Sequence, residues 1–583
     1  MNIIGIQWGD TSTAAAIENN KVIAAIAEER FTRIKNEMSF PINSIKYCIN
    51  QFKNQQIDLV TIASKEFEYI NTLTHFYSLP ISEMIKLQDT YYYPLFYQNK
   101  KKDLLLLLKK FWNTNQYPKS YWSNVNSSKI KTFSKDVRKI TSQATGVADK
   151  KILNIEHHKC HANYAYYSSP FKDKKCLIFT IDGAGDRGIN ATISIGNNGK
   201  MEKFYETKNA IIGRIYSHIT LLLGMRRLEH EYKIMGLAPY AQHKVDKDTF
   251  KVFDDCIKLD GHKFKFKKKP TDAYFYFEKK LKGKRFDVIA AALQEWVEKI
   301  IQKWILNTIK EKKINNIVIS GGVSMNAKAM GRLLEMPEVK NLWVPGAGQD
   351  DSICIGAAME VNKNKNKFFN LNSLYLGTDA DIDEEKFIKS LSKNKFIISR
   401  YSHTKAAKLI SLGKVFGRCV GRMEFGPRSL GNRAIIADPR KAEIKQLINS
   451  MIKKRDFWMP FAPTVLDKFS KKYLKNYNKF KSHHMSVTYQ TTTLGYNNLK
   501  AASHEADKTV RAQILQKEIN PTYYELINSF SKITKCGALL NTSFNLHGSP
   551  VVRTLQEALE VLNGSGLDGI ISKNFIISKK NKK

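Results

Sequence analysis

Short apolar runs separated by polar turns open the chain. The apolar runs are residues 2–8, 13–17 and 22–27, and the turns between them are 9–12 and 19–20. This pattern predicts three β-strands. It recurs with apolar runs at 176–181 and 191–195 and polar turns at 182–186 and 196–200. Two strand–acidic turn–strand hairpins predict a duplicated domain, and each half places an aspartate, Asp10 or Asp182, after its first strand.

Later patterns predict an α/β fold. Helical periodicity returns at 288–309, and two strand–loop–helix units follow at 316–326 and 341–351. The region 66–145 is rich in aromatic residues and lysine, has a helical stretch at 100–112, and is predicted to be an insertion. The stretch 361–370 resembles a linker, and a second α/β segment follows it and closes with 537–545. We therefore expect domains at 1–370 and 371–583.

Composition limits the class of protein. The 583 residues are 43% hydrophobic and 11% aromatic, which excludes wholesale disorder, and the formal net charge is +40. That charge is compatible with nucleic acid, an acidic membrane or anionic substrates, but lysines spread over solvated faces are the favoured explanation. The seven cysteines include no CxxC pair, and the longest aliphatic run, 104–108, is far shorter than a membrane span. With no basic segment before the first apolar run, we expect a cytoplasmic protein.

A histidine pair is the first candidate for chemistry. Residues i and i+4 share one face of a helix, so His157 and His161 could hold one metal ion, whereas His158 should point away from it. Two histidines and one carboxylate suit Fe(II) or a similar divalent ion, and Asp350 is the candidate third ligand. An isolated HxxxH pattern is more often a surface or packing feature than a metal site.

Glycine-rich turns suggest a nucleotide cleft. The sequence GGVSMN at 321–326 follows a predicted strand and precedes a helix, where backbone N–H groups can approach a phosphate or ribose. Together with the acidic turns at Asp10 and Asp182, it predicts nucleotide binding, with the aspartates orienting the phosphates through a cation such as Mg²⁺ or through water. The candidate nucleotide-binding residues are Gly183, Gly321, Gly322, Val323 and Asn326. A glycine pair at a strand end is otherwise usually only a turn.

The C-terminal half concentrates arginine between glycines, at 417–433, 452–458 and 507–513. Arginine makes bidentate contacts with anions, and Lys453 and Arg455 would point the same way from an extended strand. Ser543 and Asn545 have the same spacing. With Arg511 nearby, these residues predict a pocket for a small phosphorylated molecule, and a plain basic surface is the alternative.

Several segments together resemble the NodU/CmcH family of O-carbamoyltransferases, which act in nodulation-factor and antibiotic pathways. They occur in family order over nearly the whole chain. The matching segments are EERFTRIKNEMSFP (28–41), HHKCHANYAYYSSPF (157–171), DGAGD (182–186), KIMGLAPY (233–240), SGGVSMN (320–326), GQDDSICIGAA (348–358), GRMEFGPRSLGNRAIIADPR (421–440), IKKRDFWMPFAP (452–463), TVRAQ (509–513) and LLNTSFNLHGSPVV (540–552).

The resemblance implies a two-domain, ATP-dependent enzyme. Its N-terminal domain would be similar to tRNA threonylcarbamoyl transferase, an actin/Hsp70-like (ASKHA) fold, and its C-terminal domain to threonylcarbamoyl-AMP synthase. The C-terminal domain would form carbamoyl-adenylate from carbamoyl phosphate and ATP, and the N-terminal domain would transfer the carbamoyl group to a hydroxyl of a small molecule with the help of iron. The implied carbamoyl phosphate-binding residues are Lys453, Arg455, Arg511, Ser543 and Asn545. The implied catalytic residues are Asp10, Lys35, Asp182, Lys453 and Arg455, and the implied metal ligands are His157, His161 and Asp350.

The sequence departs from the family pattern at three places that bear on the acceptor side. Gly9 replaces the histidine of HDAS, residues 230–233 read HEYK in place of GEGK, and residues 548–550 read GSP in place of GEP. Two other functions stay open, namely a tRNA-modifying enzyme and a non-catalytic nucleotide-binding module. The expected partner is a small-molecule hydroxyl acceptor, its pocket lined in part by 66–145, and neither nucleic acid nor a membrane is expected. A homodimer is compatible with the sequence, which does not indicate an oligomeric state.

Overall fold

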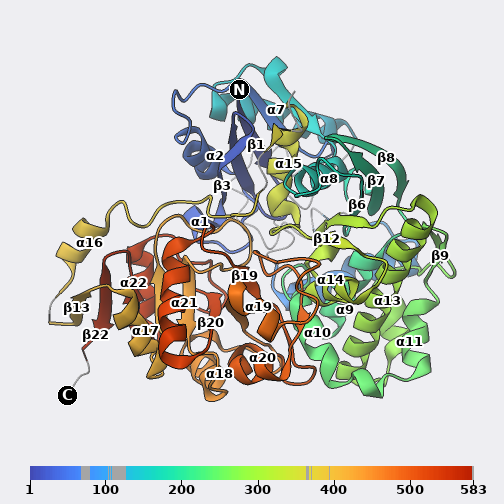
Figure 1. Cartoon of the computed structure of the whole chain (residues 1–583). Coiled ribbons are helices and arrows are strands. Elements are labelled where there is room, and N and C mark those ends of the chain that lie inside the picture. The colour runs from blue at the N-terminus through green and yellow to red at the C-terminus, as the bar shows by residue number, and fades with distance from the viewer. Residues whose placement is uncertain are drawn as a thin grey trace. The chain divides into compact units, whose positions relative to one another are not determined.

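The computed structural model describes residues 1–66, 79–102, 104, 107, 127–362, 367–368, 371–392 and 394–580. The chain divides into two compact units, drawn together in Figure 1. The first unit holds residues 1–28, 36–325 and 348–370, and the second holds 29–35, 326–347 and 371–583. Most of the helix expected at 100–112 lies outside the described residues.

The first unit begins with a five-stranded sheet of order β3-β2-β1-β4-β5. Strand β1 pairs antiparallel with β2 and parallel with β4, β2 pairs antiparallel with β3, and β4 pairs parallel with β5. Every residue of β1 is buried, as expected for a strand covered on both faces. The strands are β1 (Asn2–Gln7), β2 (Thr13–Glu18), β3 (Lys21–Ala27), β4 (Leu59–Ala63) and β5 (Ile152–Ile155).

A second sheet in this unit repeats the arrangement. Its strands β8-β7-β6-β11 have the same order and the same directions as β3-β2-β1-β4, with two antiparallel pairs followed by a parallel pair. These strands are β6 (Cys176–Ile181), β7 (Ala191–Asn197), β8 (Lys200–Thr207) and β11 (Asn316–Ser320). The α/β class and the two hairpins predicted from the sequence are therefore confirmed.

The corresponding hairpins of the two sheets also turn in the same way. Asn19 and Asn20 join β2 to β3 with φ of 48° and 66°, and Asn198 and Gly199 join β7 to β8 with φ of 48° and 72°. Two successive residues with positive φ form the turn that matches the twist of a hairpin, and asparagine and glycine adopt it most readily. Each half of the unit thus encodes its hairpin in a two-residue turn.

Helices cover these sheets. Helix α15 packs against α8, β1 and β4 within the first unit (Figure 1). The longest helix among the described residues, α13, ends at Lys312 and is capped by Lys313, whose left-handed backbone closes the helix. In the part of the chain that the structure describes, the α-helices of this unit are α2 (Ile42–Ile49), α4 (Ile81–Leu87), α5 (Tyr93–Tyr97), α7 (Ser127–Thr145), α8 (His157–Tyr167), α9 (Ile212–Leu222), α10 (Glu231–Leu237), α11 (Lys247–Asp254), α12 (Phe275–Leu281), α13 (Phe286–Lys312) and α15 (Ile353–Glu360). A small hairpin joins β9 (Ile257–Asp260) to β10 (Lys263–Phe266).

The second unit contains an eight-stranded mixed sheet of order β13-β22-β21-β14-β15-β20-β16-β19. Only the pairs β14–β21 and β16–β19 are parallel. The strands are β13 (Phe396–Arg400), β14 (Phe416–Cys419), β15 (Arg433–Ala437), β16 (Ala462–Leu466), β19 (Gln513–Leu515), β20 (Ala538–Ser543), β21 (Gly569–Ile571) and β22 (Phe575–Lys579). The shorter strands β17 (Tyr489–Gln490) and β18 (Thr509–Val510) form a separate pair. The residues of β12 (Asn341–Trp343) are counted with the second unit, although this strand is hydrogen-bonded in the sheet of β11, β6, β7 and β8.

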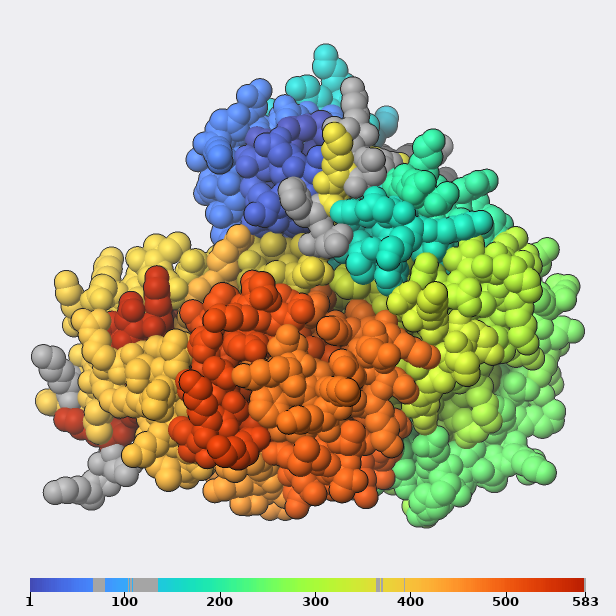
Figure 2. Space-filling view, in the orientation of Figure 1, coloured from blue at the N-terminus to red at the C-terminus, as the bar shows by residue number. Residues whose placement is uncertain are grey.

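An apolar core of aliphatic and phenylalanine side chains lies against this sheet, with Ile435, Leu540 and Ile570 among its buried members. In the space-filling view, residues from about 370 onward, coloured yellow to red, form a continuous surface (Figure 2). The helices of the second unit are α1 (Glu29–Thr32), α14 (Ala327–Glu335), α16 (Glu384–Ser390), α17 (His403–Ser411), α18 (Glu443–Ile448), α19 (Asp467–Tyr473), α20 (Thr493–Asn498), α21 (Pro521–Thr534) and α22 (Leu555–Asn563).

Among the described residues, none of the helices combines the length and the apolar character that crossing a membrane requires.

Candidate active site

Carboxylates fix the start of helix α8 in the first unit. The side chain of Glu156 caps the helix by accepting hydrogen bonds from the backbone N–H groups of His158 and Lys159. Asp186, which is buried, accepts the N–H of His157 at 2.9 Å, and it also accepts those of Lys65 and Glu66 from the loop after β4. Such caps satisfy donors that have no partner inside the helix. Glu156 and Asp186 therefore fix the position of the first turn of α8, and with it the position of the His157 side chain.

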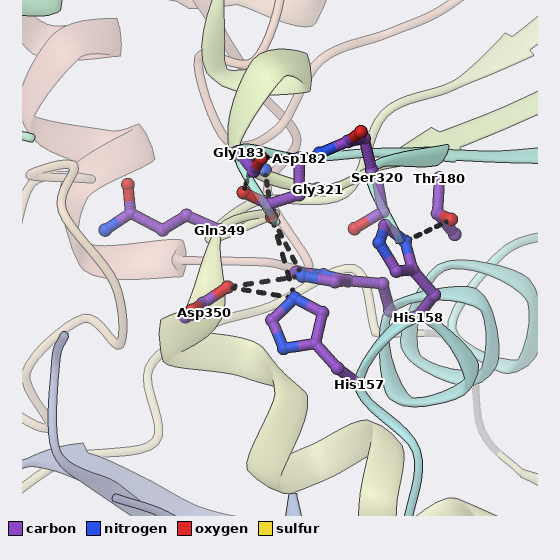
Figure 3. A network of polar contacts seen from close by, with 12 residues as sticks. His157, His158, Thr180, Asp182, Gly183, Ser320, Gly321, Gln349 and Asp350 are labelled. Carbon is purple, nitrogen blue, oxygen red and sulfur yellow. Dashed lines mark hydrogen bonds and ion pairs between the residues drawn. The ribbon is translucent and has the colours of Figure 1, made fainter. Parts of the chain in front are cut away.

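Four side chains converge beside this helix end. His157 and His161 are joined by Asp182, which directly follows β6, and by Asp350, which precedes α15. Their ligand atoms all lie within 4.8 Å of one another. The Nε2 atom of His161 is 3.1 Å from Asp182 Oδ2 and 3.3 Å from Asp350 Oδ1, and His157 Nε2 is 3.7 Å from Asp350 Oδ1. Figure 3 shows His157, Asp182 and Asp350 pointing toward one another.

The donor set of this cluster fits a divalent cation. The Nε2 atoms of both histidines are buried and make no hydrogen bond of good geometry within the described residues. Burial opposes protonation of His157, but Asp350 and Asp182 outweigh it and raise the pKa of His157 to about 10. Burial likewise opposes ionisation of Asp182, yet the two imidazoles hold its pKa well below the ordinary value. The cluster therefore favours positive charge at its centre, and two nitrogens with two carboxylates suit Fe(II) or a similar ion.

His158 has a different role. Its Nε2 donates to the backbone oxygen of Ile189 at 2.9 Å, because a carbonyl can only accept, so its Nδ1 accepts from the hydroxyl of Thr180 at 2.8 Å. Burial, followed by the nearby His157 and His161, lowers the pKa of His158 to about 3. Figure 3 shows His158 directed to Thr180. The ring is held neutral and apart from the cluster.

Gly185 makes room for two of these rings. A Cβ atom at this position would lie 2.6 Å from His157 Cδ2 and 2.9 Å from His158 Cδ2. We expect Gly185→Ala to displace His157, to lower the metal affinity at least about tenfold, and to cost roughly 1–3 kcal/mol of folding stability, as overpacking does. Titration with Fe(II) or Co(II) and thermal unfolding check this.

Gly183→Ala is the matched control in the same turn, because a Cβ atom there meets nothing within 4 Å. It should keep the wild-type metal affinity. Equal metal affinity in Gly185→Ala and the wild type would show that the His157 ring does not need this space.

The predicted nucleotide loops adjoin Asp182. Its Oδ1 accepts the N–H of Gly183 at 2.6 Å and its Oδ2 accepts that of Gly322 at 2.8 Å. Gly321 has a φ of 101°, and a Cβ atom there would lie 2.2 Å from the backbone oxygen of Ile181, so this turn requires glycine. Asp182 thus connects the turns at Gly183 and at Gly322 to the four side chains described above, His157, His161, Asp182 and Asp350, hereafter called the cation cluster.

The remaining predicted residues of this region are dispersed. Val323 lies 3.1 Å from the position of a Cβ atom on Gly213, at the start of α9. Asn326 caps helix α14 by accepting the N–H of Ala329, and the structural division assigns it to the second unit. Asp10 is half-buried in the bend between β1 and β2.

A buried lysine organises the predicted anion pocket of the second unit. Lys453 Nζ donates to Asn545 Oδ1 at 2.7 Å, to the backbone oxygen of Ser543 at 2.5 Å, and at 3.2 Å to both Ser543 Oγ and the backbone oxygen of Asn545. Burial, then the charges of Arg455 and Lys35, lowers the pKa of Lys453 well below its ordinary value. The structure therefore gathers Lys453, Arg455, Ser543 and Asn545, and it adds Lys35.

Two expectations about this pocket change. Lys453 ends a π-helical turn, Asn449–Lys453, and Lys454 then has a left-handed φ of 44°, so Lys453 and Arg455 do not lie on an extended strand as predicted. Lys35 belongs to the second unit, whereas the sequence suggested a place with Asp10 and Asp182. Arg511 is half-buried in the turn between β18 and β19.

Two arginines of the 417–433 segment are structural. Arg418 and Arg433 are 1% and 0% exposed, and both donate to protein oxygens, among them the backbone oxygens of Gly431 and Val420. Glu424 accepts the N–H groups of Leu430, Asn432 and Arg433 and so closes the loop between them. For these two arginines the predicted role in binding anions is wrong, because their buried guanidinium groups already donate hydrogen bonds to oxygens of the protein.

Sequence reasoning missed three features of the two sites. Asp182 is a fourth member of the cation cluster, Asp186 and Gly185 position its histidines, and Lys35 accompanies Lys453. The DGAGD sequence held the signal for the first two, since an aspartate five residues after a strand can reach a neighbouring helix end. No local pattern signals Lys35.

Comparisons with known proteins agree over both units. The family model "Carbamoyltransferase N-terminus" matches residues 2–359, and "Carbamoyltransferase C-terminus" matches residues 407–579. An uncharacterized protein of Methanocaldococcus jannaschii is 30% identical over 100% of both chains. The nodulation protein NolNO of Sinorhizobium fredii is 29% identical over 97% of this chain and 78% of its own. The 3'-hydroxymethylcephem-O-carbamoyltransferase of Amycolatopsis lactamdurans is 22% identical over 60% of this chain and 65% of its own.

Proposed function

The chain belongs to the carbamoyltransferase family and is a transferase, and from this premise we propose that it is an ATP-dependent O-carbamoyltransferase. The acceptor would be a hydroxyl group of a small molecule, a natural product or a sugar. The relative from Amycolatopsis lactamdurans, whose name gives this type of transfer to a hydroxymethyl group, supports the proposal. The reaction would run in two steps, activation of the carbamoyl group and its transfer.

Activation is assigned to the second unit. Water would hydrolyse carbamoyl phosphate to carbamate and phosphate, and a carbamate oxygen would then attack the α-phosphorus of ATP to form carbamoyl-adenylate and release pyrophosphate. The observation that carries this assignment is the buried Lys453. Its amine donates hydrogen bonds only to Ser543 and Asn545 within the described residues, and the positive charges of Arg455 and Lys35 lie close enough to lower its pKa. These partners of the Lys453 amine are oxygens of Ser543 and Asn545 and include no carboxylate, so a phosphate oxygen brought beside this amine would supply the negative charge that stabilises its protonated form.

Transfer is assigned to the first unit. His157, His161, Asp182 and Asp350 would hold Fe(II) or a similar ion, which supplies Lewis acidity for the carbamoyl carbonyl. Asp182 also holds the amides of Gly183 and Gly322, so the glycine turns that would receive the nucleotide stay beside the reacting carbonyl. Mg²⁺ is a further candidate cation for ATP.

The sheet arrangement supports an actin/Hsp70-like first unit. Two sheets share one order of strands and one type of hairpin turn, as expected for a duplicated nucleotide-binding domain. The likeness of either unit to tRNA-modifying enzymes is carried by sequence resemblance alone.

Two measurements test the proposed function. Protein mixed with ATP and carbamoyl phosphate should release pyrophosphate, and mass spectrometry of a panel of alcohols should find one that gains a carbamoyl group in place of hydrogen. Absence of pyrophosphate release, also in the presence of the alcohols, would contradict the proposal.

A further inference from the structure

Helix α9 begins directly against the loops of the candidate transfer site in the first unit. A Cβ atom on Gly213 would lie 3.1 Å from both Cα and N of Gly183 and 3.1 Å from Val323 Cγ2. Only a residue without a side chain allows so close an approach without a shift of these loops. The next residue, Arg214, therefore starts its side chain beside the turn that follows Asp182.

Arg214 is anchored to this turn. Its Nε donates to the backbone oxygen of Gly183 at 3.2 Å, and the N–H of Gly183 in turn donates to Asp182 Oδ1. The Arg214 side chain is exposed. A guanidinium group held by Nε keeps the two terminal nitrogens for a further partner, and that pair of donors matches a carboxylate or phosphate.

The terminal nitrogens of Arg214 have no hydrogen bond or ion pair with the part of the chain that the structure describes. Other arginines of the first unit do have carboxylate partners: Arg187 pairs with Glu206 at 3.4 Å, Arg226 with Glu229 at 3.1 Å, and Arg285 with Asp287 at 2.7 Å. Arg214 therefore differs from its neighbours in having a carbonyl as its anchor and no acid to neutralise it.

The surroundings add positive potential. His218, one turn along α9, donates its Nδ1 hydrogen to the backbone oxygen of Arg214 at 2.8 Å. Burial, then the charges of Arg227 and Arg214, lowers the pKa of His218 well below its ordinary value, so two guanidinium groups act on one imidazole. Arg227 donates to Ser217 Oγ and faces the carboxyl group of Glu231. The acid of the same turn is Asp182, whose Oδ1 accepts the N–H of Gly183 and whose Oδ2 lies 3.1 Å from His161 Nε2.

We propose that Arg214 binds an oxyanion, a phosphate or a carboxylate, of a molecule that reacts at the cluster of His157, His161, Asp182 and Asp350. The inference deepens the proposed carbamoyl transfer and rests on it. The oxyanion has two possible sources, the phosphate of the bound adenylate or an acidic group on the acceptor. Both present the paired oxygens that a guanidinium group recognises, and the test separates them.

The first arm of the test measures nucleotide binding to the full chain by calorimetry. AMP and adenosine are titrated into the wild type, Arg214→Leu and Arg214→Lys. If the nucleotide supplies the oxyanion, Arg214→Leu binds AMP about 10- to 100-fold more weakly, as expected for loss of hydrogen bonds to a charged group, and binds adenosine as before. Arg214→Lys recovers part of the AMP affinity because it restores the charge but not the paired donors.

The second arm measures carbamoyl transfer to matched acceptors: glucose, glucuronate and glucose 6-phosphate. If the acceptor supplies the oxyanion, Arg214→Leu loses transfer to the anionic acceptors by about 10- to 100-fold relative to glucose, while AMP affinity stays at the wild-type value. Arg187→Leu is the matched control for both arms, because Arg187 is exposed on the neighbouring loop but pairs with Glu206. It should behave as the wild type.

The proposal is overturned if Arg214→Leu binds AMP as the wild type does and shows no selective loss of an anionic acceptor. An equal loss of AMP and adenosine affinity overturns it as well, since that result indicates a structural role. Failure of the proposed function has a different signature, the absence of pyrophosphate release in the wild type, and nucleotide binding can be measured without turnover.

Discussion

Replacing His161 with alanine should remove the bound metal ion and carbamoyl transfer while pyrophosphate release continues. His161 is buried, its Nε2 lies 3.1 Å and 3.3 Å from two carboxylates, and its pKa is raised because Asp182 and Asp350 outweigh the cost of burial. Without this nitrogen the remaining donors cannot enclose a cation, so we expect metal affinity to fall by at least about 100-fold. Elemental analysis and the two activity assays measure the three quantities.

Two further variants make this result decisive. Asp350→Asn keeps the shape of the side chain and should also lower metal affinity, so a folding defect of His161→Ala would not hide the effect. His158→Gln is the control, because His158 contacts Thr180 and Ile189 and should not affect metal content. Equal metal in the wild type and in a His157→Ala/His161→Ala double variant would contradict the cluster as a metal site.

Arg455→Ala should give the reverse pattern, with pyrophosphate release lost and metal retained. Arg455 acts on the buried Lys453 and lies 5.3 Å from the ring of Phe461, so the fold holds its charge beside the lysine. Removing a charged donor from a preorganised site typically costs about 100-fold or more in rate. Pyrophosphate release at fixed ATP and carbamoyl phosphate measures the loss.

The neighbouring Lys454 supplies the control for this experiment. Its side chain is exposed, and alanine tolerates its left-handed backbone about as well as lysine does. Lys454→Ala should therefore release pyrophosphate at the wild-type rate. Near-wild-type release by Arg455→Ala would move the activation step to another set of residues.

Local patterns in the sequence were enough to predict much of the fold. Apolar runs separated by polar turns located the strands β1 to β3, β6 and β7, because hairpins depend on neighbouring residues, whereas β8 was not predicted. The i, i+4 spacing likewise placed His157 and His161 on one helix face. What spacing cannot give is the approach of distant segments, and so the closure of the cluster by Asp182 was missed.

Backbone conformation was the second feature that the sequence pattern did not predict. Lys453 and Arg455 have the spacing of a strand, but a π-helical turn and a left-handed residue separate them, and tertiary packing selects this conformation over the local preference. The side-chain partners of Arg418 and Arg433 could not be predicted from the sequence either. Only the folded structure shows that their guanidinium groups donate hydrogen bonds to backbone oxygens.

The assignment of residues 29–35 to the second unit bears on the timing of biosynthesis. Arg33 donates to the backbone oxygen of Val551, which lies 518 residues later in the chain, and it pairs with Glu557. At a translation rate of about 5–20 residues per second, the ribosome needs roughly 25–100 s to deliver these partners after Arg33. The segment 29–35 thus lacks these partners until the residues around Val551 and Glu557 have been synthesised, so closure of the second unit cannot begin from this segment alone.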